Sequence, residues 1–469
     1  MFDLLLKNLR VEDPVNAVSG MYDIAIDNGK IAAIQKDLSP VGAKKILSFD
    51  GVLAIPGIID LHVHVCGNFG NQTAFSMLAR SGVCTALNMA GPTTDLLSHI
   101  HEACGLNLAS LEDATPGRSL AHEAPSLKES RMFLSEAMEM GAIGVKILGG
   151  HYPLTPEGSV HIIHAAREEG GYAAWHAGTT KYGSNIEGLH ELCDLVGNEF
   201  VHVAHINSYC RGQIRHELQE VIEAQQLLEE HPSLVSESYI AASNGTSFLL
   251  NKEGQLASKN TGVTLNILGY ENSATGLGHA LMDGKAFVFV QQGDETVRLT
   301  GQEAYRLWSD AGTNIAGGFD VNPPMPRIAL AAARRKNGTF TVDCLATDGG
   351  SIPRNVLVSQ GLGLVSSGIL SMEDYIRKTS WNPSRCLCLK NKGHLGIGAD
   401  ADLSILDFHR QCALATIVGG QVCMIHGYVC GTGGTLITTE RARKHMKSLG
   451  LSCQYVDFSN GHLPFDAER

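Results

Sequence analysis

Five short apolar segments of this sequence each contain, near one end, a residue type that can bind a metal ion or move a proton. These residues are His62 and His64 in GIIDLHVH, Lys146 in AIGVKILGG, His176 in YAAWHAG, His205 in FVHVAHIN and Asp348 in VDCLATDGG. In a β-strand, residues two apart point to the same face, so His62 and His64 can reach one ion. The set predicts a site for divalent metal ions.

Lys146 is the most informative of these residues because it interrupts an apolar run that predicts a buried strand. An unpaired ammonium group is costly to bury, and burial lowers the pKa of a lysine. The resulting neutral amine can react with carbon dioxide to form a carbamate, whose anionic oxygens can bridge two cations. A lysine whose chain extends to solvent from a strand end is the alternative. A bridging carbamate explains a buried lysine better than ordinary packing does.

Each of the other residues has a simple structural alternative when it is taken alone. Paired histidines often pack in protein cores, and Asp348-Gly349 has the composition of a turn. His202 lies three residues before His205 and therefore points to the opposite face of a strand. At most one of those two belongs to a site, and we expect it to be His205, at the carboxyl end of the strand.

The elements that must position these residues alternate between short apolar runs and helical patterns from residue 57 to about 390. Such alternation predicts a parallel sheet, either a (β/α)8 barrel or an open doubly wound sheet. In a parallel barrel, the carboxyl ends of all strands meet at one face, where active sites are built. One ion can then take His62, His64, a Lys146 carbamate and Asp348, and the other can take the carbamate, His176 and His205.

Both ends of the chain have β-rich texture. Residues 1–56 contain the hairpin signal Asp27-Asn28-Gly29, and residues 391–440 again show short strands separated by glycines. We expect the two segments to pair into a small composite β-sandwich beside a barrel of residues 57–390. Residues 236–299 look rich in strands and loops, and we expect an insertion there that shapes the substrate pocket.

Composition narrows the functional classes. The 469 residues carry a formal net charge of −12, without the clustered positive field that a nucleic-acid site requires. No apolar run approaches the length of a membrane span, and the N-terminus lacks the apolar core of a signal peptide. The 12 cysteines show no paired C-x-x-C spacing. We therefore expect a reduced, cytoplasmic protein that acts on a small molecule without nucleic-acid or membrane partners.

The order of these motifs resembles the amidohydrolase superfamily, in the branch of dihydropyrimidinases, dihydroorotases and N-acyl-amino-acid deacylases. PGIIDLHVH, GVKI, WHAG, HVAHIN and ATDGG match strands 1, 4, 5, 6 and 8 of that family, and GADADLSILD matches a strand of its terminal β domain. The resemblance covers nearly the whole chain and implies a TIM barrel with two divalent ions. Zinc is favoured for them, with manganese, nickel and iron as alternatives.

The resemblance also implies a mechanism. A hydroxide that bridges the two ions would attack an amide or cyclic amide carbonyl, and Asp348 would carry a proton to the leaving nitrogen. Relatives often keep a tyrosine about five residues after the strand 4 lysine to stabilise the developing oxyanion. Tyr152 lies six residues after Lys146, so either His151 or Tyr152 can fill this role.

Two arginines are candidates for substrate binding. Arg211 follows His205 by six residues and Arg354 follows Asp348 by six, so either can bind a substrate carboxylate in bidentate fashion. Each can equally be a surface or loop arginine. A clamp would imply an N-acyl amino acid, a dipeptide-like amide or a cyclic ureide, and TDGGSIPRN is closer to deacylases than to hydantoinases.

Two other functions remain open on the sequence. A one-metal deaminase of the same superfamily generally lacks the strand 4 lysine and uses a glutamate near strand 5, which is missing after WHAG. A non-catalytic relative would have lost metal ligands, whereas all six candidate ligands are present. Relatives commonly form dimers or tetramers, so a homo-oligomer is expected.

Overall fold

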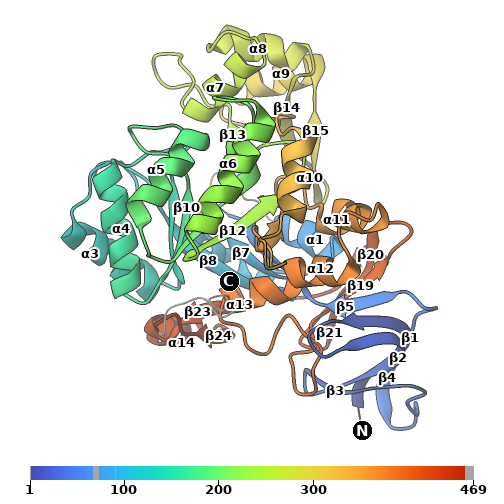
Figure 1. Ribbon diagram of the computed structural model, residues 1–469. Coiled ribbons are helices and arrows are strands. Elements are labelled where there is room, and N and C mark those ends of the chain that lie inside the picture. The colour runs from blue at the N-terminus through green and yellow to red at the C-terminus, as the bar shows by residue number, and fades with distance from the viewer. Residues whose placement is uncertain (1, 67–72, 90, 460–469) are drawn as a thin grey trace.

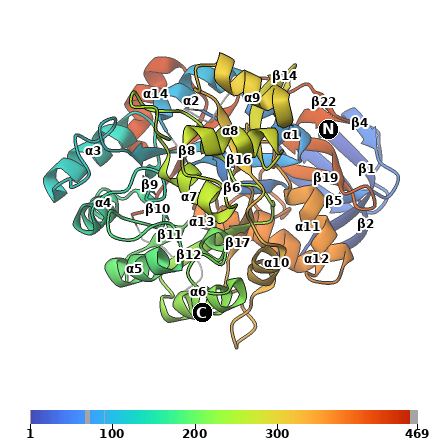
Figure 2. The same ribbon diagram turned by 90° about the horizontal axis from the view of Figure 1, so that it is seen from above.

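A closed barrel of parallel strands forms the centre of the computed structural model, which describes residues 2–66, 73–89 and 91–459 (Figures 1 and 2). Its strands, in order around the barrel, are β6 (Ile58–His64), β7 (Val83–Asn88), β8 (Asn107–Ala114), β9 (Gly144–Leu148), β10 (Tyr172–His176), β11 (Val201–Val203), β12 (Leu234–Tyr239) and β17 (Cys344–Ala346). Each pairs in parallel with the next. These strands are apolar and almost wholly buried, as a barrel covered by helices requires.

The barrel closes through a short strand that continues β17. This strand, β18 (Gly349–Gly350), pairs in parallel with β6 by matching Gly349 with Val63 and Gly350 with His64. Gly350 has φ +82°, and a Cβ atom there would lie 2.4 Å from the backbone oxygen of His64. Only glycine permits this close approach. Closure decides between the two predicted topologies and confirms the barrel.

Helices cover the outside of the barrel, one after each strand. They are α1 (Thr73–Arg80), α2 (Thr93–His99), α3 (Leu127–Glu139), α4 (Pro156–Glu168), α5 (Ile186–Val196), α6 (Glu217–Glu230), α10 (Pro324–Ala332) and α11 (Leu357–Ser366). Local sequence fixes where several of them begin. Ser126 forms a capping box with Glu129 at α3, and Thr155 caps α4 ahead of a proline at its first position. Within the described ranges, every helix is too short or too polar to cross a lipid bilayer.

The two ends of the chain meet in a separate nine-stranded sheet, at the lower right of Figure 1. It contains β1 (Phe2–Asp13), β2 (Val18–Asp27), β3 (Lys30–Gln35), β4 (Ala43–Ser48), β5 (Leu53–Pro56), β19 (Leu403–Asp407), β20 (Cys412–Val418), β21 (Gln421–Ile425) and β22 (Tyr428–Val429). The N-terminal and C-terminal parts join where β5 and β19 pair in antiparallel fashion. The predicted fold class, a barrel beside a β domain built from both termini, is confirmed.

The last C-terminal strands lie elsewhere. β23 (Thr435–Thr439) pairs in parallel with β8 and with β24 (Cys453–Val456), so both extend the barrel sheet. Leu436 and Ile437 are buried against the barrel, which explains why this strand leaves the terminal sheet. The C-terminal part of the chain also contains the helices α12 (Met372–Ile376), α13 (Asn382–Cys386) and α14 (Arg443–Leu449).

A small subdomain separates β12 from β17 and stands above the barrel in Figure 1. It contains a four-stranded sheet of β13 (Thr246–Ser247), β16 (Ala316–Phe319), β14 (Ala286–Gln292) and β15 (Glu295–Leu299). Helices α7 (Lys259–Ile267), α8 (Ala274–Met282) and α9 (Gly301–Asp310) pack on it around an apolar cluster that includes Phe248, Trp308 and Phe319. The segment expected as an insertion, 236–299, therefore includes the end of a barrel strand and omits β16, which pairs with β13 and β14.

Candidate metal centre

One cavity at the carboxyl ends of the barrel strands brings together the site residues expected from the sequence. Its lining includes His62, His64, Lys146, His151, Tyr152, His176, His205, Arg211, Asp348 and Arg354. The strands run parallel, so residues that lie far apart in the chain, such as His62 and Asp348, end at the same rim. Ser208, Tyr239, Asn244 and Asn260 line the same cavity and were not foreseen.

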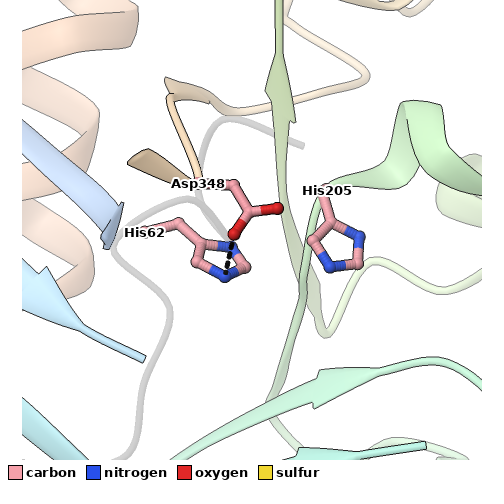
Figure 3. Close-up of side chains that lie close together, drawn as sticks. All are labelled: His62, His205 and Asp348. Carbon is pink, nitrogen blue, oxygen red and sulfur yellow. Dashed lines mark ion pairs between the residues drawn. The ribbon is translucent and has the colours of Figure 1, made fainter. Parts of the chain in front are cut away.

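Three of these residues form the tightest cluster. One ligand atom from each of His62, His205 and Asp348 lies within 4.8 Å of the others (Figure 3). Asp348 Oδ1 lies 3.3 Å from His62 Nε2 and 2.8 Å from His64 Nε2. The ring centres of His176 and His205 are 4.4 Å apart. The four imidazoles and one carboxylate thus converge as ligands of a divalent cation do.

Two members of the cluster have unusual backbone conformations. His205 has φ 38° and Asp348 has φ 51°, the left-handed region that side chains other than glycine rarely adopt. Both lie where a strand turns into a loop, and the turn directs their side chains into the cavity. Strain of this kind is typical of functional sites.

Burial sets the protonation of the histidines. Removal from water lowers the pKa of His62, His176 and His205 well below the ordinary value of 6.5. They are therefore neutral near pH 7, and neutral imidazole is the form that binds metal ions. This donor set fits zinc and related divalent ions.

Lys146 has very few polar contacts for a buried lysine. Its residue is 1% exposed, and its Nζ donates to the Met89 sulfur at 3.3 Å. A thioether is a weak acceptor, so this contact compensates little of the lost hydration. Burial lowers the pKa of Lys146 to about 8, with Glu237 and Asp348 acting in the opposite direction. An amine in such surroundings fits conversion to an anionic carbamate ligand.

Glu237 of β12 belongs to the site although sequence reasoning missed it. Its Oε1 lies 2.7 Å from His62 Nδ1 and accepts a hydrogen bond of 2.7 Å from the His205 backbone N–H. When the proton of His62 is on Nδ1, its Nε2 keeps a lone pair that can bind a metal ion. This nitrogen lies on the side of Asp348, at 3.3 Å from Oδ1. The sequence feature that could have identified Glu237 is an acidic residue inside the segment LVSESY. In the structure, all six residues of this segment are buried.

We predict that replacing Glu237 with leucine will weaken metal binding about 10- to 100-fold, because outer partners of ligating histidines have effects of that size. Glu237→Gln keeps an acceptor oxygen for both N–H groups and should lie much closer to wild type. The measurement is the metal dissociation constant from competition with a chromophoric chelator.

The matched control is Glu191→Gln, another buried glutamate, whose carboxylate accepts from Thr179 outside the cavity. It should bind metal as the wild type does. Equal affinities for the Leu and Gln variants at position 237 would contradict a positioning role for Glu237.

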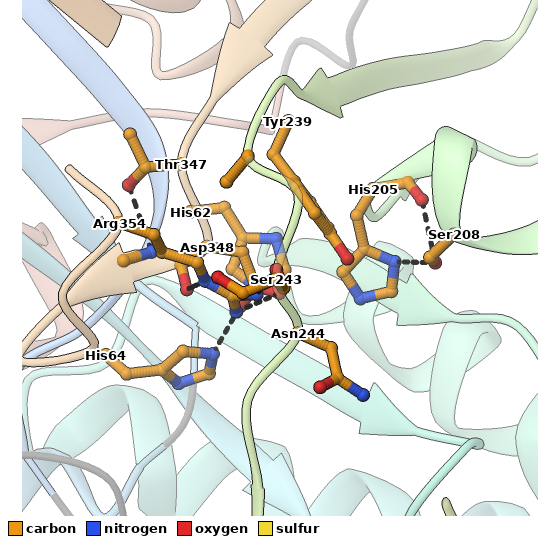
Figure 4. A network of polar contacts seen from close by, with 12 residues as sticks. His62, His64, His205, Ser208, Tyr239, Ser243, Asn244, Thr347, Asp348 and Arg354 are labelled. Carbon is orange, nitrogen blue, oxygen red and sulfur yellow. Dashed lines mark hydrogen bonds and ion pairs between the residues drawn. The ribbon is translucent and has the colours of Figure 1, made fainter. Parts of the chain in front are cut away.

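Serine hydroxyl groups orient the rings of His205 and His176. Ser208 Oγ lies 2.7 Å from His205 Nδ1 (Figure 4), and Ser184 Oγ lies 2.7 Å from His176 Nε2. In each ring, the other nitrogen remains available to an ion. His202 instead lies 2.8 Å from the Tyr172 hydroxyl and is not among the residues that line the cavity.

The two arginines expected to be equivalent have different partners. Arg354 is buried and forms an ion pair of 2.6 Å with Asp348 Oδ2, while it donates to the Asp348 and Ser243 carbonyls. Arg211 donates to Asn322 Oδ1 at 2.8 Å and to the Tyr239 hydroxyl at 3.0 Å, both neutral acceptors. Arg354 therefore holds Asp348, whereas Arg211 keeps its charge unpaired among the described carboxylates.

The same ion pair affects the charge of Asp348. Burial alone would raise the pKa of Asp348, but Arg354 and His64 outweigh burial and lower it. Asp348 is therefore a carboxylate near pH 7, which suits a metal ligand and a proton acceptor.

His151 and Tyr152 both line the cavity but differ in exposure. The His151 ring packs edge-on to His176 with centres 5.2 Å apart, and burial lowers the pKa of His151 to about 4. Tyr152 lines the cavity and is 38% exposed. Both remain candidates for contact with the substrate.

Comparisons with known proteins find relatives of this chain. The sequence model of the Amidohydrolase family matches residues 298–432. Over 437 residues, the chain is 23% identical to a dihydroorotase of Elusimicrobium minutum (strain Pei191), covering 87% of this chain and 88% of that enzyme.

Two solved structures share the fold at low sequence identity. An N-acyl-D-glutamate deacylase from Bordetella bronchiseptica, solved with zinc and a phosphonate inhibitor, is 14% identical with a TM-score of 0.64, covering 92% of this chain and 98% of that one. L-hydantoinase from Arthrobacter aurescens is 18% identical with a TM-score of 0.55, covering 93% and 99% of the two chains. The chain is thus similar in sequence to the Amidohydrolase family and to dihydroorotases, and it shares its fold with a hydantoinase and a D-amino-acid deacylase.

Proposed function

We propose that the protein hydrolyses the C–N bond of a small carboxylate-bearing amide, either a linear N-acyl amino acid or a cyclic amide or ureide, with the help of bound divalent ions. Its similarity to the Amidohydrolase family and to a dihydroorotase supports hydrolysis of a C–N bond other than a peptide bond. The convergence of His62, His205 and Asp348, with ligand atoms within 4.8 Å, is the observation that carries the proposal.

The residues present fit two ions. His62, His64, Asp348 and a carbamate on Lys146 would hold one ion, and the carbamate, His176 and His205 would hold the other. Zinc is the proposed metal. When bound, such ions lower the pKa of water and polarise a carbonyl group. The buried walls of the cavity keep other water away from the reacting groups.

Asp348 is the proposed proton carrier. Its Oδ2 is held by Arg354 at 2.6 Å, which leaves Oδ1 directed at the histidines. As a carboxylate, Asp348 can take the proton of the attacking water at Oδ1 and give it to the leaving nitrogen. Arg354 keeps the carboxylate in this orientation during both transfers.

His151 or Tyr152 would stabilise the negative charge that develops on the carbonyl oxygen. The imidazole and the phenol can each donate a hydrogen bond, and both line the cavity. Tyr152 is exposed, so it can contact the substrate without displacing any part of the core.

Arg211 is the proposed partner of a substrate carboxylate. A charged hydrogen bond contributes about 1.5–3 kcal/mol, so Arg211→Met should raise KM for such substrates about 10- to 100-fold while kcat changes less. Arg215→Met is the control, because Arg215 pairs with Glu187 at 2.7 Å away from the cavity. A similar rise in KM for both variants would exclude a specific role for Arg211.

The proposed function is tested by removing metal and restoring it. Protein stripped with a chelator should be inactive, and Zn²⁺ or Mn²⁺ should restore hydrolysis of at least one member of a panel. The panel contains D- and L-N-acetyl amino acids, hydantoins, dihydrouracil and dihydroorotate. Release of ammonia from purines or pyrimidines, with no activity on the amides, would instead support the deaminase alternative.

A further inference from the structure

The side of the cavity formed by the subdomain carries an amide group whose donor has no partner. Asn244, in the loop after β12, is 3% exposed, and its Nδ2 has no hydrogen-bond partner among the described residues. Asn244 is one of the residues that line the cavity, as are His64 and His205, and Figure 4 labels all three. Buried polar groups normally have partners, so a donor left open inside a cavity indicates a ligand.

The orientation of this amide is fixed by the chain itself. The Phe319 backbone N–H donates to Asn244 Oδ1 at 2.8 Å, and the Asn244 N–H donates to the Phe319 carbonyl at 2.9 Å. Because an N–H group donates to one end of the amide, that end is the oxygen and the open end is the NH₂ group. The unpartnered group of this cavity-lining residue is therefore a hydrogen-bond donor.

Helix α7 brings a second source of donors to the same cavity. Asn260, its second residue, is one of the lining residues. The first N–H groups of a helix lack partners within the helix and carry partial positive charge. Ser258 at the N-cap makes no capping bond, and its hydroxyl contacts Thr246 at 3.0 Å instead.

The charges that line the cavity favour an anion. Among the described lining residues, Asp348 is the one carboxylate, and Arg354 pairs with it. Arg211 has neutral partners, and no described carboxylate forms an ion pair with it. A ligand that meets Arg211, the Asn244 amide and the start of α7 therefore needs acceptor oxygens and negative charge.

We propose that Asn244, Asn260 and Arg211 form a carboxylate subsite, in which the Arg211 charge favours substrates that carry a carboxylate over neutral analogues and the Asn244 amide donates to a carboxylate oxygen. This inference rests on the proposed function and assigns specificity to the subdomain between β12 and β17. The subdomain fixes Asn244 through Phe319 of β16 and supplies Asn260 from α7.

The test compares Asn244→Asp with wild type on N-acetylglycine and N-acetylglycinamide, a pair that differs only in charge at the carboxyl end. Aspartate keeps the oxygen that accepts from Phe319 and replaces the donor with a second oxygen. We expect kcat/KM for N-acetylglycine to fall about 100-fold through KM, because like charges then face each other. The value for N-acetylglycinamide should change less than about threefold.

Asn266→Asp is the matched control, since it adds the same charge at an exposed position of α7. It should leave both substrates unchanged. An equal fall for the acid and the amide in Asn244→Asp would show a structural role only, and no fall would show that Asn244 does not contact the substrate. Either result would overturn the inference.

Calorimetric titration with the same two compounds separates this inference from the proposed function. The titrations use Asp348→Asn, expected to be nearly inactive, with and without Asn244→Asp. Binding of N-acetylglycine that Asn244→Asp abolishes supports the subsite even if the wild type hydrolyses neither compound. Hydrolysis by the wild type, combined with equal binding of N-acetylglycine to both variants, would reject the subsite and leave the proposed function standing.

Discussion

Lys146→Met should leave a folded protein that has lost most of its bound metal and its activity. The ligand from Lys146 is shared between both proposed ions, so its loss affects both at once. Metal ions contribute several kcal/mol to transition-state stabilisation, which corresponds to a fall in kcat/KM of about 10³-fold or more. Metal content per chain and intact mass in bicarbonate buffer are the measurements. Wild type should carry about two ions and the added mass of carbon dioxide.

The stability of the Lys146→Met variant provides a separate readout. Among the described residues, the Lys146 ammonium has only the Met89 sulfur as a hydrogen-bond partner, so an apolar side chain should raise or preserve the thermal midpoint of the metal-free protein. Lys378→Met is the matched control, because Lys378 is equally buried and donates to the Val342 carbonyl outside the cavity. If Lys146→Met binds as much metal as Lys378→Met, the bridging role is wrong and a one-metal site must be considered.

Asp348→Asn should lower kcat about 10²- to 10⁴-fold, the usual contribution of a proton-transfer group. The amide has nearly the same shape but cannot carry the proton. Removing the charge also leaves the buried Arg354 without its ion-pair partner, so the thermal midpoint should fall as well. The measurements are single-turnover rates and thermal unfolding of the metal-loaded protein.

Asp343→Asn is the matched control, because Asp343 is a buried aspartate in the same segment, VDCLATDGG, as Asp348. Asp343 accepts from the Ser236 backbone N–H, is buried, and does not line the cavity. Its variant should keep kcat even if its stability changes. Activity of Asp348→Asn within tenfold of wild type would show that another group moves the proton.

Local sequence predicted the candidate ligands because each of them lies within or at the carboxyl end of a short apolar run. The same pattern does not identify Glu237 as a site residue, because the segment LVSESY does not end in a residue that binds metal ions. Glu237 also falls within residues 236–299, where the sequence predicts an insertion. The role of Glu237 depends on two contacts, with His62 at a separation of 175 residues and with the His205 backbone. Contacts at such separations leave no periodic signal in the sequence.

The two arginines also differ in a way that the sequence pattern does not predict. Both Arg211 and Arg354 follow a candidate ligand by six residues, so the sequence treats them alike. In the folded chain, Arg354 pairs with Asp348 and Arg211 faces neutral acceptors. Which arginine is free for a substrate depends on where the Asp348 side chain points, and that is decided by tertiary packing.

The sequence by itself predicted the family resemblance, the fold class and the candidate ligands, because residue types at strand ends and the alternation of strands and helices are local properties. Only the tertiary structure decided that the barrel closes between β18 and β6, that Phe319 of the subdomain fixes Asn244 in the cavity, and that Glu237 supports His62. Each of these results joins segments far apart in the chain. Their geometry follows from packing the whole molecule, which no single stretch of sequence encodes.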